Sequence, residues 1–309
     1  MFQYILKRVL WLIPILLGVT FVVFTIMYFS PGDPVTMMLG EGASAEAYEA
    51  LRIQMGLDRS FIEQFLSYVK QVFFEFDLGR SYVSRRIVMD EILVRLPNTL
   101  KLASWSIFFA SLIGIPLGVI SATRPYSKTD DAVMFVSLIG VSMPTFWQAL
   151  LLIILFTSTL GWLPASGFTS WEQMIMPVFA LATSYIGTIA RITRSSMMDV
   201  LDQDYIRTAH AKGVSQGKVV FQHALRNALI PVVTVIGLQF GSLLGGAVLT
   251  ETVFSINGLG TMMVNAIRTR DTMIVQGGVL FIAFVFTIVN LFVDILYAYI
   301  DPRIRSQYD

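Results

Sequence analysis

The sequence predicts an all-α membrane protein with six membrane-spanning helices. Hydrophobic residues make up 55% of its 309 residues, charged residues make up only 14%, and the mean hydropathy is +0.68. Soluble domains usually contain about 25% charged residues. Uncharged apolar runs of about 20 residues, enough for a helix to cross a bilayer, recur along the chain. A single polytopic membrane domain, residues 1–309, is therefore expected.

Six segments are expected to cross the membrane. Five contain an uncharged run about one membrane thick. The third in order is about twice as long, but the turn-forming residues 161–167 interrupt its second half. The first segment is expected to be a retained span, because it is longer than the apolar part of a signal peptide and no small-residue cleavage site follows it. The expected spans are about 9–29, 102–123, 132–160, 173–190, 228–250 and 274–298.

The distribution of basic residues predicts the orientation, because short cytoplasmic loops are enriched in Lys and Arg. Short outer loops contain only Arg268 and Arg270. Both termini and the loop 191–226 are therefore expected in the cytoplasm, and the long segment 30–100 outside. Basic residues of the expected cytoplasmic segments are Lys7, Arg8, Arg124, Lys128, Arg191, Arg194, Arg207, Lys212, Lys218, Arg226, Arg303 and Arg305.

The segment 30–100 is the one region of soluble character. Apolar and aromatic side chains recur at helical spacing between Phe61 and Val72, which predicts short helices on the outer face of the membrane. A packed cap over the bundle is favoured there over a dedicated ligand site.

Sequence signatures of catalysis and of cofactor binding are absent. Residues 213–219 resemble a phosphate-binding loop, but the glycines are one residue too close and no Ser or Thr follows Lys218. The chain has no cysteine, only His210 and His223 as histidines, and no hydrolase or zinc-protease motif. With a net charge of +1, nothing indicates nucleic acid. We therefore expect no enzyme activity, metal or cofactor in this chain.

Two features lie inside the expected spans. Gly237, Gly241 and Gly245 recur every four residues, which predicts close helix packing, either within the chain or with a second subunit. Asp294 and Asn290 share a helical face and form a candidate intramembrane polar site. Because Asp294 lies near the cytoplasmic end of its span, a structural role is favoured over a proton relay.

A polar segment between the fourth and fifth spans, YIRTAHAKG at 205–213, has the composition of a short exposed helix. Together with several other motifs it resembles the membrane subunits of binding-protein-dependent ABC importers, and specifically the dipeptide, oligopeptide and nickel permease family. The resemblance covers nearly the whole chain. Its strongest stretches are RITRSSMMDVL at 191–201, HALRNALIPVVTVIGLQFG at 223–241, LTETVFS at 249–255, NGLG at 257–260, IVQGGVL at 274–280 and DPRIR at 301–305.

This resemblance implies a type I ABC importer permease fold, with an extracytoplasmic helical insertion after the first span. It also implies a coupling helix at about 205–216 that docks into a groove on an ATPase subunit. Small alanines would let the groove close around this helix. His210, Asn257 and Thr272-Met273 depart from the residues usual in the family. The implied coupling residues are Tyr205, Arg207, Thr208, Ala209, Ala211, Lys212 and Gly213.

The function implied by the resemblance is that of one half of a translocation pathway for di- or oligopeptides in a bacterial cytoplasmic membrane. Expected partners are a homologous second permease, two ATPase subunits that bind ATP and Mg²⁺, an external substrate-binding protein and membrane lipid. Nickel or a metal chelate is the alternative substrate. A secondary transporter or channel is a remote alternative, since the spans offer few polar residues for coupling or selectivity.

Overall fold

A computed structural model describes residues 2–30, 32–40 and 42–300, and within these the side chains of 2–5, 7, 246, 294 and 296–300 are not described. Helices make up all regular structure of these residues apart from one isolated bridge between Arg80 and Ile87. The elements are α1 (Phe2–Phe29), α2 (Pro34–Leu39), α3 (Ala45–Gln54), α4 (Phe61–Phe74), α5 (Val88–Thr123), α6 (Lys128–Ser142), α7 (Thr145–Leu152), η1 (Ile153–Thr159), α8 (Trp171–Leu201), α9 (Asp204–Ala211), α10 (Gln216–Lys218), η2 (Val219–Ala224), α11 (Leu225–Gly246), α12 (Val248–Val253), α13 (Leu259–Arg268) and α14 (Thr272–Ile300).

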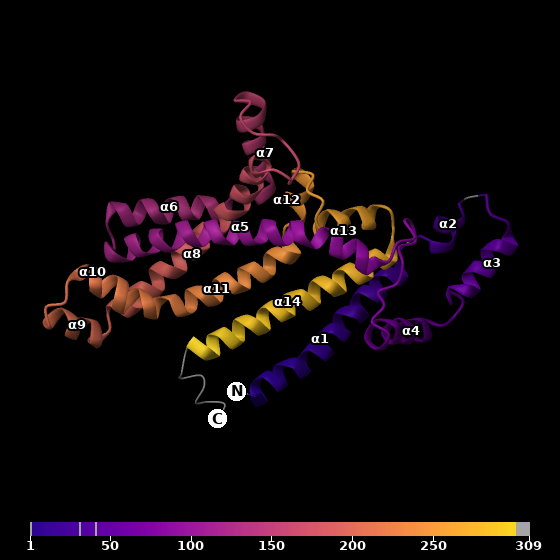
Figure 1. Ribbon diagram of the computed structural model, residues 1–309, viewed down its shortest axis with the longest axis horizontal. Helices are drawn as coiled ribbons and strands as arrows, with labels where there is room; N and C mark the ends of the chain where they lie inside the picture. The colour runs from indigo at the N-terminus through magenta and orange to yellow at the C-terminus, as the bar shows by residue number, and fades with distance from the viewer. Residues whose placement is uncertain (1, 31, 41, 301–309) are drawn as a thin grey trace.

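The long helices run side by side and give the molecule two distinct ends (Figure 1). α9 and α10 lie at one end, on the left of the view, and α2, α3 and α4 lie at the other. We call these the α9 end and the α4 end. Among the described residues, five helices are long and apolar enough to cross a membrane, and the bent pair formed by α6 and α7–η1 makes six if it counts as one span.

Helices extend beyond several of the expected spans. α5 already begins at Val88 rather than near residue 102, and α8 continues to Leu201 rather than ending near 190. The added turns contain charged residues, such as Glu91 and Arg194, that limit an apolar run without interrupting a helix. Loss of hydrophobicity therefore marked the edge of the apolar run, not the end of the helix.

The third expected span, 132–160, is not one continuous helix. α6 and α7–η1 meet at an angle of 97° (Figure 1). Pro144 has no N–H to donate and disfavours a helical conformation for Met143, whose backbone is extended at φ −82° and ψ 125°. The Gln148 amide donates to the Gly140 and Met143 carbonyls over 3.2 and 3.0 Å, so carbonyl groups near the break are satisfied. The expectation of an unbroken span took account of the turn at 161–167 but not of Pro144.

α5 and α8 approach closely because α5 carries glycines where the two helices cross. A Cβ atom built on Gly118 would lie 2.5 Å from Thr193 Cβ and 2.6 Å from the Ala190 carbonyl oxygen. A Cβ on Gly114 would meet the Ile186 carbonyl oxygen at 2.9 Å. Backbone atoms of α8 therefore occupy the space that a side chain would need.

Replacing Gly118 by alanine is expected to destabilise the protein, because the added methyl collides with the backbone of α8. Overpacking of this kind costs about 1–3 kcal/mol. Gly18→Ala is the matched control, since nothing lies within 4 Å of a Cβ atom at Gly18 in α1. The measurement is the thermal unfolding temperature of the detergent-solubilised protein. Equal unfolding temperatures for the two variants would contradict the packing described here.

The glycines of α11 lie against α14. A Cβ atom on Gly241 would be 3.3 Å from the Phe286 ring, one on Gly245 would be 3.5 Å from Ile282, and one on Gly237 would collide with Val293. This face of α11 therefore packs within the chain. Farther along α14, the Asn290 Oδ1 atom is buried without a hydrogen-bond partner among the described residues. The side chain of Asp294 lies outside the described part of the chain, as does the motif at 301–305.

Aromatic side chains attach α4 to α1 at the α4 end. Phe24 of α1 packs edge-on against Phe61 and Phe65, with 5.5 Å between ring centroids in both pairs, and stacks with Tyr68 at 5.9 Å. α4 begins with a capping box in which Ser60 and Glu63 exchange hydrogen bonds. The segment between α1 and α5 is thus a helical layer with a defined position on the bundle.

Candidate functional site

The candidate coupling element is α9, a two-turn helix between the ends of α8 and α11 (Figure 1). It ends at Ala211, earlier than the expected 216, because Gly213 adopts the left-handed conformation with φ 76°. The Val214 N–H donates to the Ala209 carbonyl over 3.2 Å, and the Gly213 N–H donates to the His210 carbonyl over 2.9 Å. This pair of bonds is a Schellman motif, which satisfies carbonyls at a helix C-terminus and requires a left-handed residue.

One side of α9 is anchored to the rest of the chain. Ile206 is only 2% exposed and belongs to a cluster with Met197 of α8 and with Val219, Val220 and Ala224 of η2. The Asn227 amide at the start of α11 donates to the Tyr205 hydroxyl over 2.9 Å. α9 is therefore attached to both helices that it connects.

The opposite side of α9 is exposed. We call it the exposed face, and it comprises Asp204, Arg207, Thr208 and Ala211. Arg207 and Asp204 are 3.6 Å apart, but both side chains are largely exposed. Such a surface ion pair contributes little to stability. Both charges therefore remain available to another surface.

Most of the predicted coupling residues lie on or beside the exposed face, but Ala209 does not. It is half-buried and packs against the cluster around Ile206. Ala211 is exposed, as are Lys212 and Gly213 in the turn that follows. Of the two alanines expected to let a groove close around the helix, Ala211 is therefore the more accessible to a second protein.

A buried ion pair fixes the neighbouring turn at the α9 end. Arg194 of α8 donates from Nε and Nη2 to both carboxylate oxygens of Asp130, over 2.7 and 2.6 Å. The Ser121 hydroxyl of α5 donates to the same carboxylate, which also accepts from the Tyr126 N–H over 2.9 Å. Paired hydrogen bonds of this geometry fix orientation as well as distance. The pair thus ties the start of α6, and the turn before it, to α8 at the α9 end.

A second buried carboxylate, not expected from the sequence, joins distant segments. Glu251 of α12 is fully buried and accepts a hydrogen bond from the Thr99 hydroxyl of α5 over 2.6 Å and one from the Thr261 N–H over 3.1 Å. The Leu259 N–H in turn donates to the Thr99 hydroxyl over 2.8 Å. Burial raises the pKa of Glu251, and its hydrogen bonds oppose that shift. Glu251 belongs to the motif at 249–255 quoted above, and that motif is the sequence feature that could have identified it.

Within the described residues, no group of three or more His, Cys, Asp or Glu side chains is arranged to hold a metal ion. His210 is exposed at the end of α9, and His223 lies in η2.

Comparison with known proteins assigns the family. A family model described as "Binding-protein-dependent transport system inner membrane component" matches residues 114–306, and the model of the N-terminal part of such membrane components matches residues 1–103. The chain belongs to this family. It is a multi-pass membrane component of a transport system.

Curated relatives in this family match over almost their full length. A dipeptide transport system permease protein of Alkalihalophilus pseudofirmus is 44% identical, and the match covers 99% of this chain and all of the relative. A glutathione transport system permease protein of Escherichia coli O6:H1 is also 44% identical, with 99% of each chain covered. A putative peptide transport system permease protein of Brucella abortus is 44% identical over 97% of this chain and 98% of the relative.

A solved structure shares the fold. An inward-facing structure of the MetNI methionine ABC transporter contains a chain with a TM-score of 0.59 and 18% sequence identity, and the match covers 68% of this permease and 95% of that chain. Together with the helical architecture, this likeness shows that the permease has the fold of type I ABC importer permeases.

Proposed function

We propose that this permease forms half of the translocation pathway of an ATP-driven importer of di- or oligopeptides. In this proposal, α9 docks on an ATPase subunit and transmits its movements to the membrane-spanning helices. The observation that carries it is the two-sided construction of α9, which is anchored through Ile206 and Tyr205 and exposed through Arg207, Thr208 and Ala211. Switching by rigid-body movement requires an element of this kind between the moving parts.

Peptides are proposed as the substrate because the relatives reported above are named for dipeptide, peptide or glutathione transport. Nickel or a metal chelate stays the alternative. The external binding protein would deliver the substrate, so most of the selectivity would reside outside this chain.

We propose that partner chains supply the other subunits of the transporter. Since residues 213–219 lack the spacing of a phosphate-binding loop, ATP and Mg²⁺ would be bound by two ATPase subunits and not by this chain. A homologous second permease would complete the pathway. The α9 end and both termini would face the cytoplasm of a bacterial inner membrane, and the α4 end would face the binding protein. The excess of Lys and Arg near α9 supports this orientation.

Reconstitution in liposomes tests the proposed function. Purified permease alone is expected to hydrolyse no ATP and to move no peptide. The permease reassembled with its second permease and ATPase subunits is expected to take up a peptide delivered by the binding protein, with ATP hydrolysis stimulated by the loaded binding protein. Peptide-stimulated ATP hydrolysis by the chain alone, or uptake that is independent of ATP, would contradict the proposal.

A further inference from the structure

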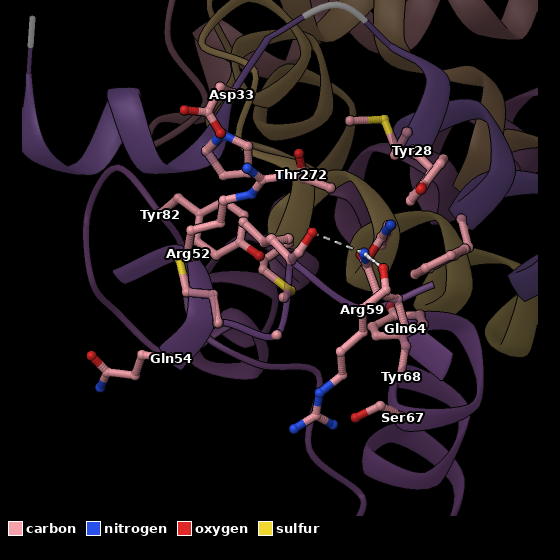
Figure 2. A pocket seen from close by; sticks show the side chains of 18 of the residues that line it. Tyr28, Asp33, Arg52, Gln54, Arg59, Gln64, Ser67, Tyr68, Tyr82 and Thr272 are labelled. Atoms are coloured by element: carbon pink, nitrogen blue, oxygen red, sulfur yellow. Dashed lines mark hydrogen bonds between the residues drawn. The ribbon is translucent and has the colours of Figure 1, made fainter. Parts of the chain in front are cut away.

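An apolar cleft of about 400 Å³ lies between α5 and α8, and we call it the α5–α8 cleft. All ten side chains that line it are apolar or aromatic. A larger cavity, of about 680 Å³, lies at the α4 end, where Figure 2 shows polar and charged side chains such as Arg52, Arg59 and Gln64 around it. Sites for small ligands typically have volumes of about 300–1,000 Å³. The lining of the α5–α8 cleft therefore suits an apolar chain.

The cleft follows the two helices within their expected spans. The α5 residues of its lining recur at four-residue spacing from Trp105 to Ile113, so they lie along one side of that helix. On α8 the lining extends from Trp171 to Ile186, which is about 22 Å at 1.5 Å per residue. The cleft closes at Ile113 and Ile186, because the next residue of α5, Gly114, brings α5 into close contact with α8. Its length is sufficient for one acyl chain from one leaflet, since half of the hydrocarbon core is about 15 Å thick.

The end of the cleft farther from α9 carries groups suited to a lipid headgroup. Trp105 and Trp171 are 45% and 70% exposed there, and tryptophan is enriched at the level of lipid headgroups. Lys101 lies one helical turn before Trp105 on the same side of α5; it is exposed and forms no ion pair with another described residue. Lys101 and Trp171 also border the expected spans 102–123 and 173–190. A lysine at the end of a span can place its ammonium group among the headgroups.

A phospholipid fits these groups better than a protein helix or a peptide does. A helix of another subunit seated in the cleft would cover Lys101, and burial of an unpaired ammonium group is costly. A peptide would bring backbone polar groups that the apolar lining cannot pair. A lipid places only hydrocarbon in the cleft and leaves its phosphate at the level of Lys101. Glu172, the acidic residue next to Trp171, is already engaged by a hydrogen bond from Ser170.

We propose that the α5–α8 cleft binds an anionic phospholipid. One acyl chain occupies the cleft, the phosphate pairs with Lys101, and the indole N–H groups of Trp105 and Trp171 donate to oxygen atoms of the headgroup region. A headgroup with a net negative charge is favoured over a zwitterionic one, because no cation of the lipid then competes with Lys101. The site lies in the leaflet farther from α9 and holds lipid between two helices that pack closely elsewhere.

Photolabelling of the permease, purified with the subunits that accompany it and reconstituted in liposomes, tests this site. The probes are phosphatidylglycerol and phosphatidylcholine with the same diazirine group at the end of one acyl chain. Adducts are located by mass spectrometry and are expected on the cleft residues of α5 and α8. Phosphatidylglycerol is expected to label them about five times more than phosphatidylcholine, the factor typical of one basic side chain at a membrane surface. Lys101→Gln is expected to reduce labelling by phosphatidylglycerol to the level of phosphatidylcholine.

The matched control is Lys70→Gln, which removes another exposed lysine, on α4 and away from the cleft, and is expected to change nothing. Lys101 is exposed, so its substitution is expected to leave the packing of α5 intact. Three results would overturn the site: no adduct on the cleft residues, as when another subunit covers them; equal labelling by the two lipids, as in unspecific contact with the bilayer; or unchanged labelling by phosphatidylglycerol in Lys101→Gln.

Discussion

An Ala211→Glu variant is expected to lose peptide uptake in reconstituted liposomes by about tenfold or more. Ala211 is exposed on the exposed face of α9, so the substitution is expected to leave the fold of the permease intact. On docking, the new carboxylate would be buried without a partner, and that costs more than the 1.4 kcal/mol that corresponds to a factor of ten in affinity. The ATPase subunits are accordingly expected to copurify poorly.

Gln216→Glu is the matched control, because it adds the same charge in the same loop but outside α9. It is expected to keep both uptake and copurification of the ATPase subunits. If Ala211→Glu transports peptide at the wild-type rate, the docking surface lies elsewhere in the segment 191–226.

An Ile206→Ala variant is expected to separate ATP hydrolysis from transport. Truncating a buried Ile or Leu costs about 2–5 kcal/mol, and Ile206 is the most deeply buried side chain that holds α9 to the cluster below it. The exposed face is unchanged, so the ATPase subunits still dock, but a loosened α9 no longer moves α8 and α11 with them. Peptide uptake therefore falls several-fold more than the basal rate of ATP hydrolysis does.

The control for this variant is Ile62→Ala, the same truncation at an isoleucine that is largely exposed on α4. Uptake and hydrolysis are measured in the same liposomes. Parallel losses of both activities in Ile206→Ala, with normal values in Ile62→Ala, would indicate that Ile206 supports docking itself and would remove the distinction between the two sides of α9.

The sequence was sufficient to predict the position of α9, but not its last residue or its orientation. The helix was expected to reach about residue 216, whereas Gly213 adopts the left-handed conformation and α9 ends at Ala211. The orientation was inferred only from residue size, which treated Ala209 and Ala211 alike. Ile206, the one large aliphatic residue of α9, faces the cluster, and Ala209 three residues later shares its side of the helix. The spacing of each alanine from Ile206 therefore indicates which of the two faces the cluster.

Other features depend on contacts that a single sequence does not reveal. Pro144 is a local sequence signal for the bend after α6. The hydrogen bonds from Gln148 to carbonyl groups near the break, in contrast, depend on the three-dimensional arrangement. The pairing of Thr99 with Glu251 joins residues 152 positions apart. The cavity between the α3 and α4 layer and the ends of α1 and α14 likewise forms between segments far apart in the sequence. Local periodicity predicted the helices, whereas the chemistry between them had to be read from the structure.

Site-specific photo-crosslinking in the assembled transporter tests most directly the claim that the exposed face of α9 docks on an ATPase subunit. Benzoylphenylalanine is placed at Thr208 on the exposed face and, as a control, at Ile62 on α4. We predict a covalent adduct with the ATPase subunit from position 208 and none from position 62. Efficient incorporation at 208 with no ATPase adduct, while the complex remains active in uptake, would contradict the account.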